Sequence, residues 1–200
     1  MLRIGFLASH GGSGMRAVVD AIRTGALKAQ ASVVIANNSS APALQTARQA
    51  GIPCCHLSAK THPVREDLDA AIRDELVHHA TDIVLLSGYM KPIGPLTLER
   101  FQHRVLNTHP ALLPRFGGQG MYGDHVHRAV LAEGATVTGA SIHIVDGAYD
   151  HGPVVRQRAV PVLGNDTVDT LRPRVQEAER DLILEVFAGL SAGRLHLHTA

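Results

Sequence analysis

The chain has 200 residues, of which 45% are hydrophobic and 18% are charged, which is the composition of a globular protein. This length matches one ordinary domain, so we expect residues 1–200 to form a single domain. The 19 basic and 18 acidic residues leave a net charge of +1. Proteins that hold duplex nucleic acid usually carry a strong basic excess, so the net charge argues against nucleic acid as a partner. It does not exclude a small anionic ligand, because one phosphate group needs only a local site.

The sequence patterning also predicts that the protein does not enter a membrane. No apolar run approaches the ~18 residues of a membrane-spanning helix. The apolar stretch at 2–8 is too short for the core of a signal peptide and leads directly into a glycine loop. Cys54 and Cys55 are adjacent, and because neighbouring residues form only a strained disulfide, we expect reduced thiols. These features predict a cytoplasmic protein.

The first half of the chain alternates short apolar runs with helical patterns. Strands are predicted at 2–8, 32–36, 53–57, 83–86 and 104–106, and helices at 15–24, 42–50, 63–79 and 95–102. Repeated strand–helix–strand order is typical of crossover connections and a largely parallel sheet. The runs are apolar throughout, as expected of strands that are covered on both faces.

The second half has a different pattern. A loop rich in glycine, proline and histidine is predicted at 110–124, followed by a helix at 125–133 and alternating strands at 138–145 and 154–162. The last helix is predicted at 167–190, with Asp166 as its cap and a kink or a later start at Pro173. A closing strand is predicted at 194–198. Alternating strands with a short connection form an antiparallel pair. The predicted fold is therefore Rossmann-like α/β, with a mostly parallel central sheet flanked by helices and an antiparallel C-terminal strand pair.

A glycine-rich loop joins the first strand to the first helix. Gly12, Ser13 and Gly14 lie where free backbone N–H groups and the helix dipole favour an anion. The loop lacks both the dinucleotide pattern G-x-G-x-x-G and the lysine of a P-loop, so a dinucleotide or a nucleoside triphosphate is disfavoured. A plain tight turn explains the loop about as well as a phosphate site does.

Two polar side chains follow the strand predicted at 104–106. Asn107 and His109 are two residues apart, so they point to the same side of an extended chain. They lie at the carboxyl end of a strand, where open α/β sheets bind ligands. An amide and a protonated imidazole both donate hydrogen bonds to a developing oxyanion. A capped strand end with a structural histidine is the alternative interpretation.

The turn between the two alternating strands carries Asp146 and Asp150. A carboxylate close to His109 would raise the pKa of the imidazole and orient its ring. The 150 − 109 = 41 residues between them do not show that they meet, and an acidic hairpin turn is the alternative. Asp124, His125 and His127 are of metal-ligand type, but Asp124 is also a natural helix cap, and we predict no metal there.

Five short segments of the chain occur in the same order as in a known protein family. They are the loop at 9–14, SGYMKPI at 87–93, NTHPALLP at 107–114, GMYG at 120–123 and YDHGP at 149–153. The chain resembles the formyltetrahydrofolate-dependent formyltransferases over nearly its whole length, and most closely those that act on glycinamide ribonucleotide. The resemblance implies transfer of a formyl group from 10-formyltetrahydrofolate, a co-substrate, to the primary amine of glycinamide ribonucleotide, without a metal.

The resemblance also implies roles for particular residues. The catalytic trio of the family matches Asn107, His109 and Asp150. The folate-binding positions match Arg65, Met90, Lys91, Pro92, Ile93, Val145 and Asp146, together with Asn107 and Asp150. The acceptor-binding positions match Gly12, Ser13 and Gly14 for the phosphate and Glu179 for the ribose hydroxyls. Two departures are Gly14, where the family commonly has Asn, and Arg180, where histidine is common.

Other functions remain as alternatives. A transformylase acting on tRNA usually carries a further C-terminal domain and a basic surface, and a formyltetrahydrofolate hydrolase usually carries an N-terminal regulatory domain; neither is expected here. A non-catalytic binder of a nucleotide or a folate would not need Asn107, His109 and Asp150 together. We expect small-molecule substrates, no nucleic acid or membrane partner, and a monomer or homodimer.

Overall fold

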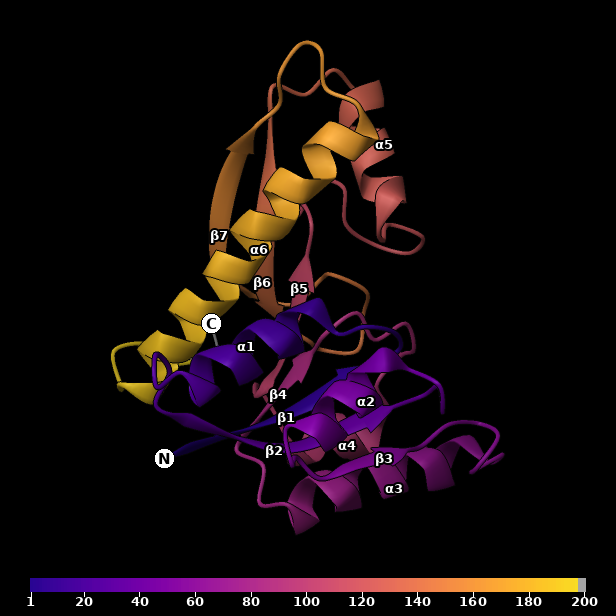
Figure 1. Ribbon diagram of the computed structural model, residues 1–200. Coiled ribbons are helices and arrows are strands. Elements are labelled where there is room, and N and C mark those ends of the chain that lie inside the picture. The colour runs from indigo at the N-terminus through magenta and orange to yellow at the C-terminus, as the bar shows by residue number, and fades with distance from the viewer. Residues whose placement is uncertain (198–200) are drawn as a thin grey trace.

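A seven-stranded sheet forms the centre of the protein, as described by a computed structural model for residues 1–197 (Figure 1). The strands are β1 (Leu2–Ala8), β2 (Ala29–Ala36), β3 (Cys54–His56), β4 (Ile83–Leu86), β5 (Val105–His109), β6 (Val137–Ile144) and β7 (Val154–Pro161). Their order in the sheet is β3-β2-β1-β4-β5-β6-β7. The first five strands are parallel to one another, while β6 is antiparallel to both β5 and β7. The predicted fold class is confirmed.

Within residues 1–197, six helices accompany the sheet. They are α1 (Ser13–Arg23), α2 (Pro42–Gln49), α3 (Arg65–His78), α4 (Pro95–Arg100), α5 (Asp124–Ala132) and α6 (Val168–Ser191). Helices α1, α2 and α6 cover one face of the sheet, and α3 and α4 cover the other (Figure 1). Along β1, Phe6 packs in the first of these layers and Leu7 in the second, and both are fully buried. This burial on both faces explains why the parallel strands are apolar throughout.

The sheet topology brings two loops together. Strands β1 and β4 are neighbours in the sheet although they are far apart in sequence, and parallel strands end at the same edge. The Met15 N–H donates to Ser87 Oγ (2.9 Å), and the Met90 N–H donates to Ser9 Oγ (2.8 Å). The loop after β1 is thereby fixed against the loop after β4. Strand β5 ends at the same edge, so three of its polar residues lie beside these loops.

Some predicted boundaries are wrong. Strand β5 continues to His109 because it pairs with β6 as far as Ser141, so Asn107 belongs to the strand and does not follow it. The cap of α6 is Thr167, which forms a capping box with Thr170, while Asp166 accepts the Leu163 N–H instead. Helix α6 runs through Pro173.

The predictions for the C-terminal residues, for the two cysteines and for membrane-spanning helices have different outcomes. Residues 194–197 form no strand, and His198 of the predicted closing strand lies outside the described residues. Cys54 and Cys55 are free thiols, as expected. Within residues 1–197, no helix combines the length and the apolar character needed to span a membrane.

Candidate active site

Asn107 and His109 both approach one carboxylate. Asn107 Nδ2 lies 3.5 Å from Asp150 Oδ1, and His109 Nδ1 lies 3.3 Å from Asp150 Oδ2. The two side chains share a face of β5 because they are two positions apart, as predicted. His109 is buried, and only 10% of the Asp150 side chain is exposed. The structure therefore brings together the three polar side chains that the family resemblance implied would act together.

Asp150 is held in place by its backbone as well as by its partners. It lies in the connection between β6 and β7, with a φ of 55°, in the left-handed region that non-glycine residues seldom adopt. Its carboxylate also accepts a hydrogen bond from the Gly118 N–H (3.1 Å). Backbone strain of this kind persists where the surroundings fix a residue, often at functional sites.

His143 is a site residue that the sequence analysis missed. It lies on β6 directly opposite Asn107 and is buried. Its Nε2 atom is 3.2 Å from Asn107 Nδ2 and 3.4 Å from Asp150 Oδ1. The alternating strand predicted at 138–145 contains this residue, so pairing that strand with the one that carries Asn107 would have indicated it.

The loop between β5 and α5 closes over the site. His109 Nε2 donates to the carbonyl oxygen of Phe116 at 2.7 Å, and Gly118 contacts Asp150. Phe116 has a φ of 56°, which directs its carbonyl toward the imidazole. Both nitrogens of His109 thus face acceptors. A developing oxyanion has to replace the Phe116 carbonyl before His109 can stabilise it.

The ionisation of the site differs from the prediction in one respect. Burial lowers the pKa of His109 below its ordinary value of 6.5, although Asp150 and the Phe116 carbonyl act in the opposite direction. The carboxylate does act to raise this pKa, as predicted, but desolvation of the ring outweighs it, so the net shift is downward. Burial alone would raise the pKa of Asp150, but hydrogen bonding from His143, the charge of His109 and the Gly118 N–H together lower it.

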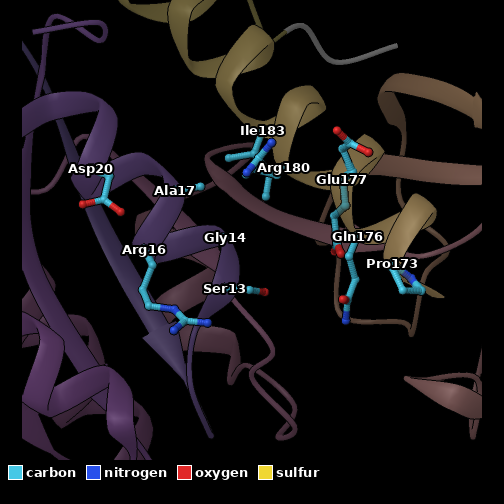
Figure 2. A pocket seen from close by; sticks show the side chains of 11 residues that line it. Ser13, Gly14, Arg16, Ala17, Asp20, Pro173, Gln176, Glu177, Arg180 and Ile183 are labelled. Carbon is cyan, nitrogen blue, oxygen red and sulfur yellow. The ribbon is translucent and has the colours of Figure 1, made fainter. Parts of the chain in front are cut away.

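A cavity of about 580 Å³ lies between α1 and α6 (Figure 2). Ser13 and Gly14 line it from the start of α1, and Glu179 lines it from α6. Burial raises the pKa of Glu179, and a hydrogen bond from Thr108 only partly offsets this effect. Thr108 lies between Asn107 and His109 on β5, so the cavity and the polar trio flank the end of the same strand.

A second cavity, of about 480 Å³, receives some of the predicted folate-binding residues. Arg65, Lys91 and Pro92 line it together with Lys60 and Tyr89. The three cationic side chains make no ion pair within residues 1–197, and they come from three different segments. Cations around a partly apolar wall suit a ligand that combines an aromatic body with carboxylates.

The remaining predicted folate-binding residues lie elsewhere. Met90 is 46% exposed and lines neither cavity, while Ile93 is buried in the core cluster beneath α3 and α4, against which Val145 also packs. Asp146 accepts the Ala148 N–H (3.2 Å) at the surface of the loop that carries Asp150. Only part of this predicted set therefore shares one cavity.

Asp124, one of the three residues considered as metal ligands, has a structural partner instead. Both carboxylate oxygens of Asp124 accept from Arg172 Nη1 at 2.8 Å, which ties the start of α5 to α6. Asp124 is the first residue of α5 and not its cap, which is Gly123. Among the described residues, no three His, Cys, Asp or Glu side chains gather as a metal site would require.

We expect the protein to lose stability as the pH falls below about 6.5. Burial lowers the pKa of His109 and of His127, so the unfolded chain binds protons in this range that the folded protein does not bind. The free energy of unfolding should therefore decrease from pH 6.5 toward the lower pKa values of the folded state and vary little with these groups above it. Urea unfolding at pH 7.5 and 5.5 measures the decrease. In His127→Gln the decrease should be smaller, and an equal decrease in both proteins would contradict the assignment.

The comparisons with known proteins identify the class. The chain belongs to the formyl transferase family, whose profile matches residues 2–187. It is 36% identical to the phosphoribosylglycinamide formyltransferase of Escherichia coli (strain K12), over 98% of this chain and 91% of that protein. It is 38% identical to the chloroplastic phosphoribosylglycinamide formyltransferase of Vigna unguiculata over 96% of its own length, but spans only 62% of that longer protein. The crystal structure of glycinamide ribonucleotide transformylase 1 from Symbiobacterium toebii matches with a TM-score of 0.90 at 36% identity, covering 99% of this chain and 91% of that chain.

Proposed function

We propose that this enzyme transfers the formyl group of 10-formyltetrahydrofolate to the primary amine of glycinamide ribonucleotide, a step of purine biosynthesis. The observation that carries this proposal is the convergence of Asn107, His109 and Asp150 at the end of β5, next to the cavity between α1 and α6. The names of the relatives support the choice of acceptor. A hydrolase acting on the same folate is the alternative, with water in place of the amine.

The chemistry requires stabilisation of a tetrahedral intermediate. The acceptor amine attacks the formyl carbon, and the carbonyl electrons move to its oxygen. Asn107 and His109 are placed to donate hydrogen bonds to this oxyanion, once it replaces their present acceptors. Collapse of the intermediate breaks the bond to the folate nitrogen, and that nitrogen takes up a proton as the amine loses one.

Asp150 is the group best placed to transfer the proton from the attacking amine to the folate nitrogen. Its pKa lies below the usual value, so it is ionised at neutral pH and accepts a proton only transiently. It also contacts His109 Nδ1 and opposes the loss of charge that burial imposes on the ring. We assign to Asp150 the orientation of His109 and the relay of the proton, through water, from the attacking amine to the folate.

The two cavities suit the two substrates. The N–H groups of Ser13 and Gly14 are left free at the start of α1 and favour the acceptor phosphate, while the Glu179 carboxylate suits the ribose diol. The folate is assigned to the side of Tyr89 and Arg65, whose cationic cavity fits its carboxylates. A cytoplasmic location, the absence of a metal and a monomeric or dimeric state remain predictions.

A formyl-transfer assay tests the proposal. The protein is mixed with 10-formyltetrahydrofolate, and release of tetrahydrofolate is followed with and without glycinamide ribonucleotide. We expect release only when the ribonucleotide is present. Release without it would identify a hydrolase. Absence of release in both mixtures would contradict the proposed activity.

A further inference from the structure

Arg16 places a positive charge near the start of α1, in the cavity between α1 and α6. It lies in the fourth position of α1 and lines the cavity, and Figure 2 shows its side chain running back toward the start of the helix, beside Ser13. Side chains of a helix lean toward its N-terminus, so this direction is the ordinary one. The Arg16 guanidinium is therefore on the same side of the cavity as the free N–H groups of Ser13 and Gly14.

The charge of Arg16 has no partner that would explain it structurally. The side chain is exposed, and its guanidinium makes no hydrogen bond or ion pair within residues 1–197. The first turn of α1 contains no acidic residue. A cation near a helix N-terminus is opposed by the helix dipole, so this arginine does not stabilise α1. A bound anion would make the same position favourable.

The packing around Gly14 explains why a charge is useful at this position. A Cβ at Gly14 would lie 2.8 Å from Ile183 Cδ1 and 3.3 Å from Ser87 Oγ. The Ser87 hydroxyl accepts the Met15 N–H, and Ile183 is buried in the core, so α6 occupies the space of a side chain at position 14. Gly14 can offer only its backbone to an anion. Any further side-chain donor has to come from a neighbouring position.

Three other charged groups of the cavity lie further from the start of α1 in Figure 2. Asp20 is one turn further along the helix and is 3.4 Å from Arg23, and Glu177 points away from Ser13 in Figure 2. Arg180 lies across from Ala17, near Ile183, and its nearest carboxylate is Asp181 at 3.9 Å. Arg16 is thus the cation closest to Ser13 among the residues that line this cavity.

We propose that Arg16 binds the phosphate of the acceptor and determines the preference for a phosphorylated over an unphosphorylated acceptor. This inference rests on the proposed function and adds a specificity-determining residue to it. A guanidinium donates two hydrogen bonds to phosphate in a fixed geometry, which an exposed backbone site alone does not provide. Glutamine at this position keeps a polar side chain of similar helix preference, but it is shorter and carries no charge.

The test compares two acceptors and two variants. The quantity measured is kcat/KM for glycinamide ribonucleotide and for the corresponding riboside, which lacks the phosphate. In Arg16→Gln, kcat/KM for the ribonucleotide should fall about tenfold or more, as expected for loss of a charged hydrogen bond. The value for the riboside should not change. Arg48→Gln removes the same charge from an exposed position of α2 that lines neither cavity, and should change either value less than about threefold.

Each outcome of this experiment is decisive. If Arg16→Gln acts equally on both acceptors, or no more strongly than Arg48→Gln, Arg16 does not bind the phosphate. Where the riboside gives no measurable turnover, the inhibition constant of ribose 5-phosphate replaces it and should rise about tenfold in Arg16→Gln. Thermal unfolding should show Arg16→Gln to be at least as stable as the wild type. If the wild type does not formylate the ribonucleotide, the proposed function fails, whereas normal turnover with an unaffected Arg16→Gln overturns only this inference.

Discussion

Asp150→Asn is expected to lower kcat by about a hundred- to ten-thousand-fold, with little change in folate affinity. The amide cannot accept the proton that the amine loses, and it no longer opposes the effect of burial on the His109 charge. His109→Ala should give a loss of similar size, because it removes the donor to the oxyanion. The measurements are kcat from the formyl-transfer assay and the dissociation constant of the folate.

The matched control is Asp74→Asn. Asp74 is an exposed carboxylate of α3 that pairs with Arg73 and faces neither cavity. Its replacement should leave kcat unchanged. Near-normal kcat in Asp150→Asn or in His109→Ala would show that the assigned roles are wrong.

Gly152→Ala is expected to destabilise the fold by about 2–4 kcal/mol and to abolish most of the activity. A Cβ at this position would lie 1.9 Å from the carbonyl oxygen of Ile144, which is backbone and cannot turn aside. The adjacent Pro153 carbonyl accepts the Ile144 N–H (2.9 Å), so this contact closes the loop that carries Asp150. Relieving the clash has to move Asp150 away from His109. Urea unfolding and kcat measure the two effects.

Gly164→Ala is the control for this substitution. Gly164 has open space around it and no positive φ, so the extra methyl group should change the free energy of unfolding by less than about 0.5 kcal/mol. If Gly152→Ala were as stable and as active as Gly164→Ala, the close approach to Ile144 would not constrain the catalytic loop.

The sequence predicts most of the fold because the hydrophobic pattern of each strand agrees with the way that strand pairs in the sheet. The central parallel strands β1 and β4 are largely apolar runs buried on both faces, and the alternating runs at 138–145 and 154–162 form the antiparallel pair. Asn107 and His109 were also predictable as a pair, because a two-residue spacing in a strand fixes a common side. The approach of Asp150 followed only from the family resemblance, since no local rule joins residues 41 positions apart.

Other features of the site depend on interactions that a sequence does not display. The Phe116 carbonyl reaches His109 through the path of a long loop, and backbone groups have no signature in the side-chain pattern. His143 enters the site through the register between β5 and β6. The lowered pKa of His109 reflects how completely the ring is buried, and burial outweighs the neighbouring charge that the sequence analysis emphasised.

The change of strand direction at β5 has a consequence for how the protein is made. Strands β1 to β5 and the loops that follow β1 and β4 are synthesised before Asp150 is added to the chain. Domains fold as units, and α6, which is synthesised last, supplies Ile183 and Phe187 to the core cluster that contains Phe6 of β1, so the parallel part of the sheet is not fully packed before α6 is present. The carboxylate reaches His109 only after β6 has doubled back along β5. A nascent chain that stops short of this point has the loops after β1 and β4 but not the complete proposed trio, and the cavity between α1 and α6 is complete only when α6 has been added.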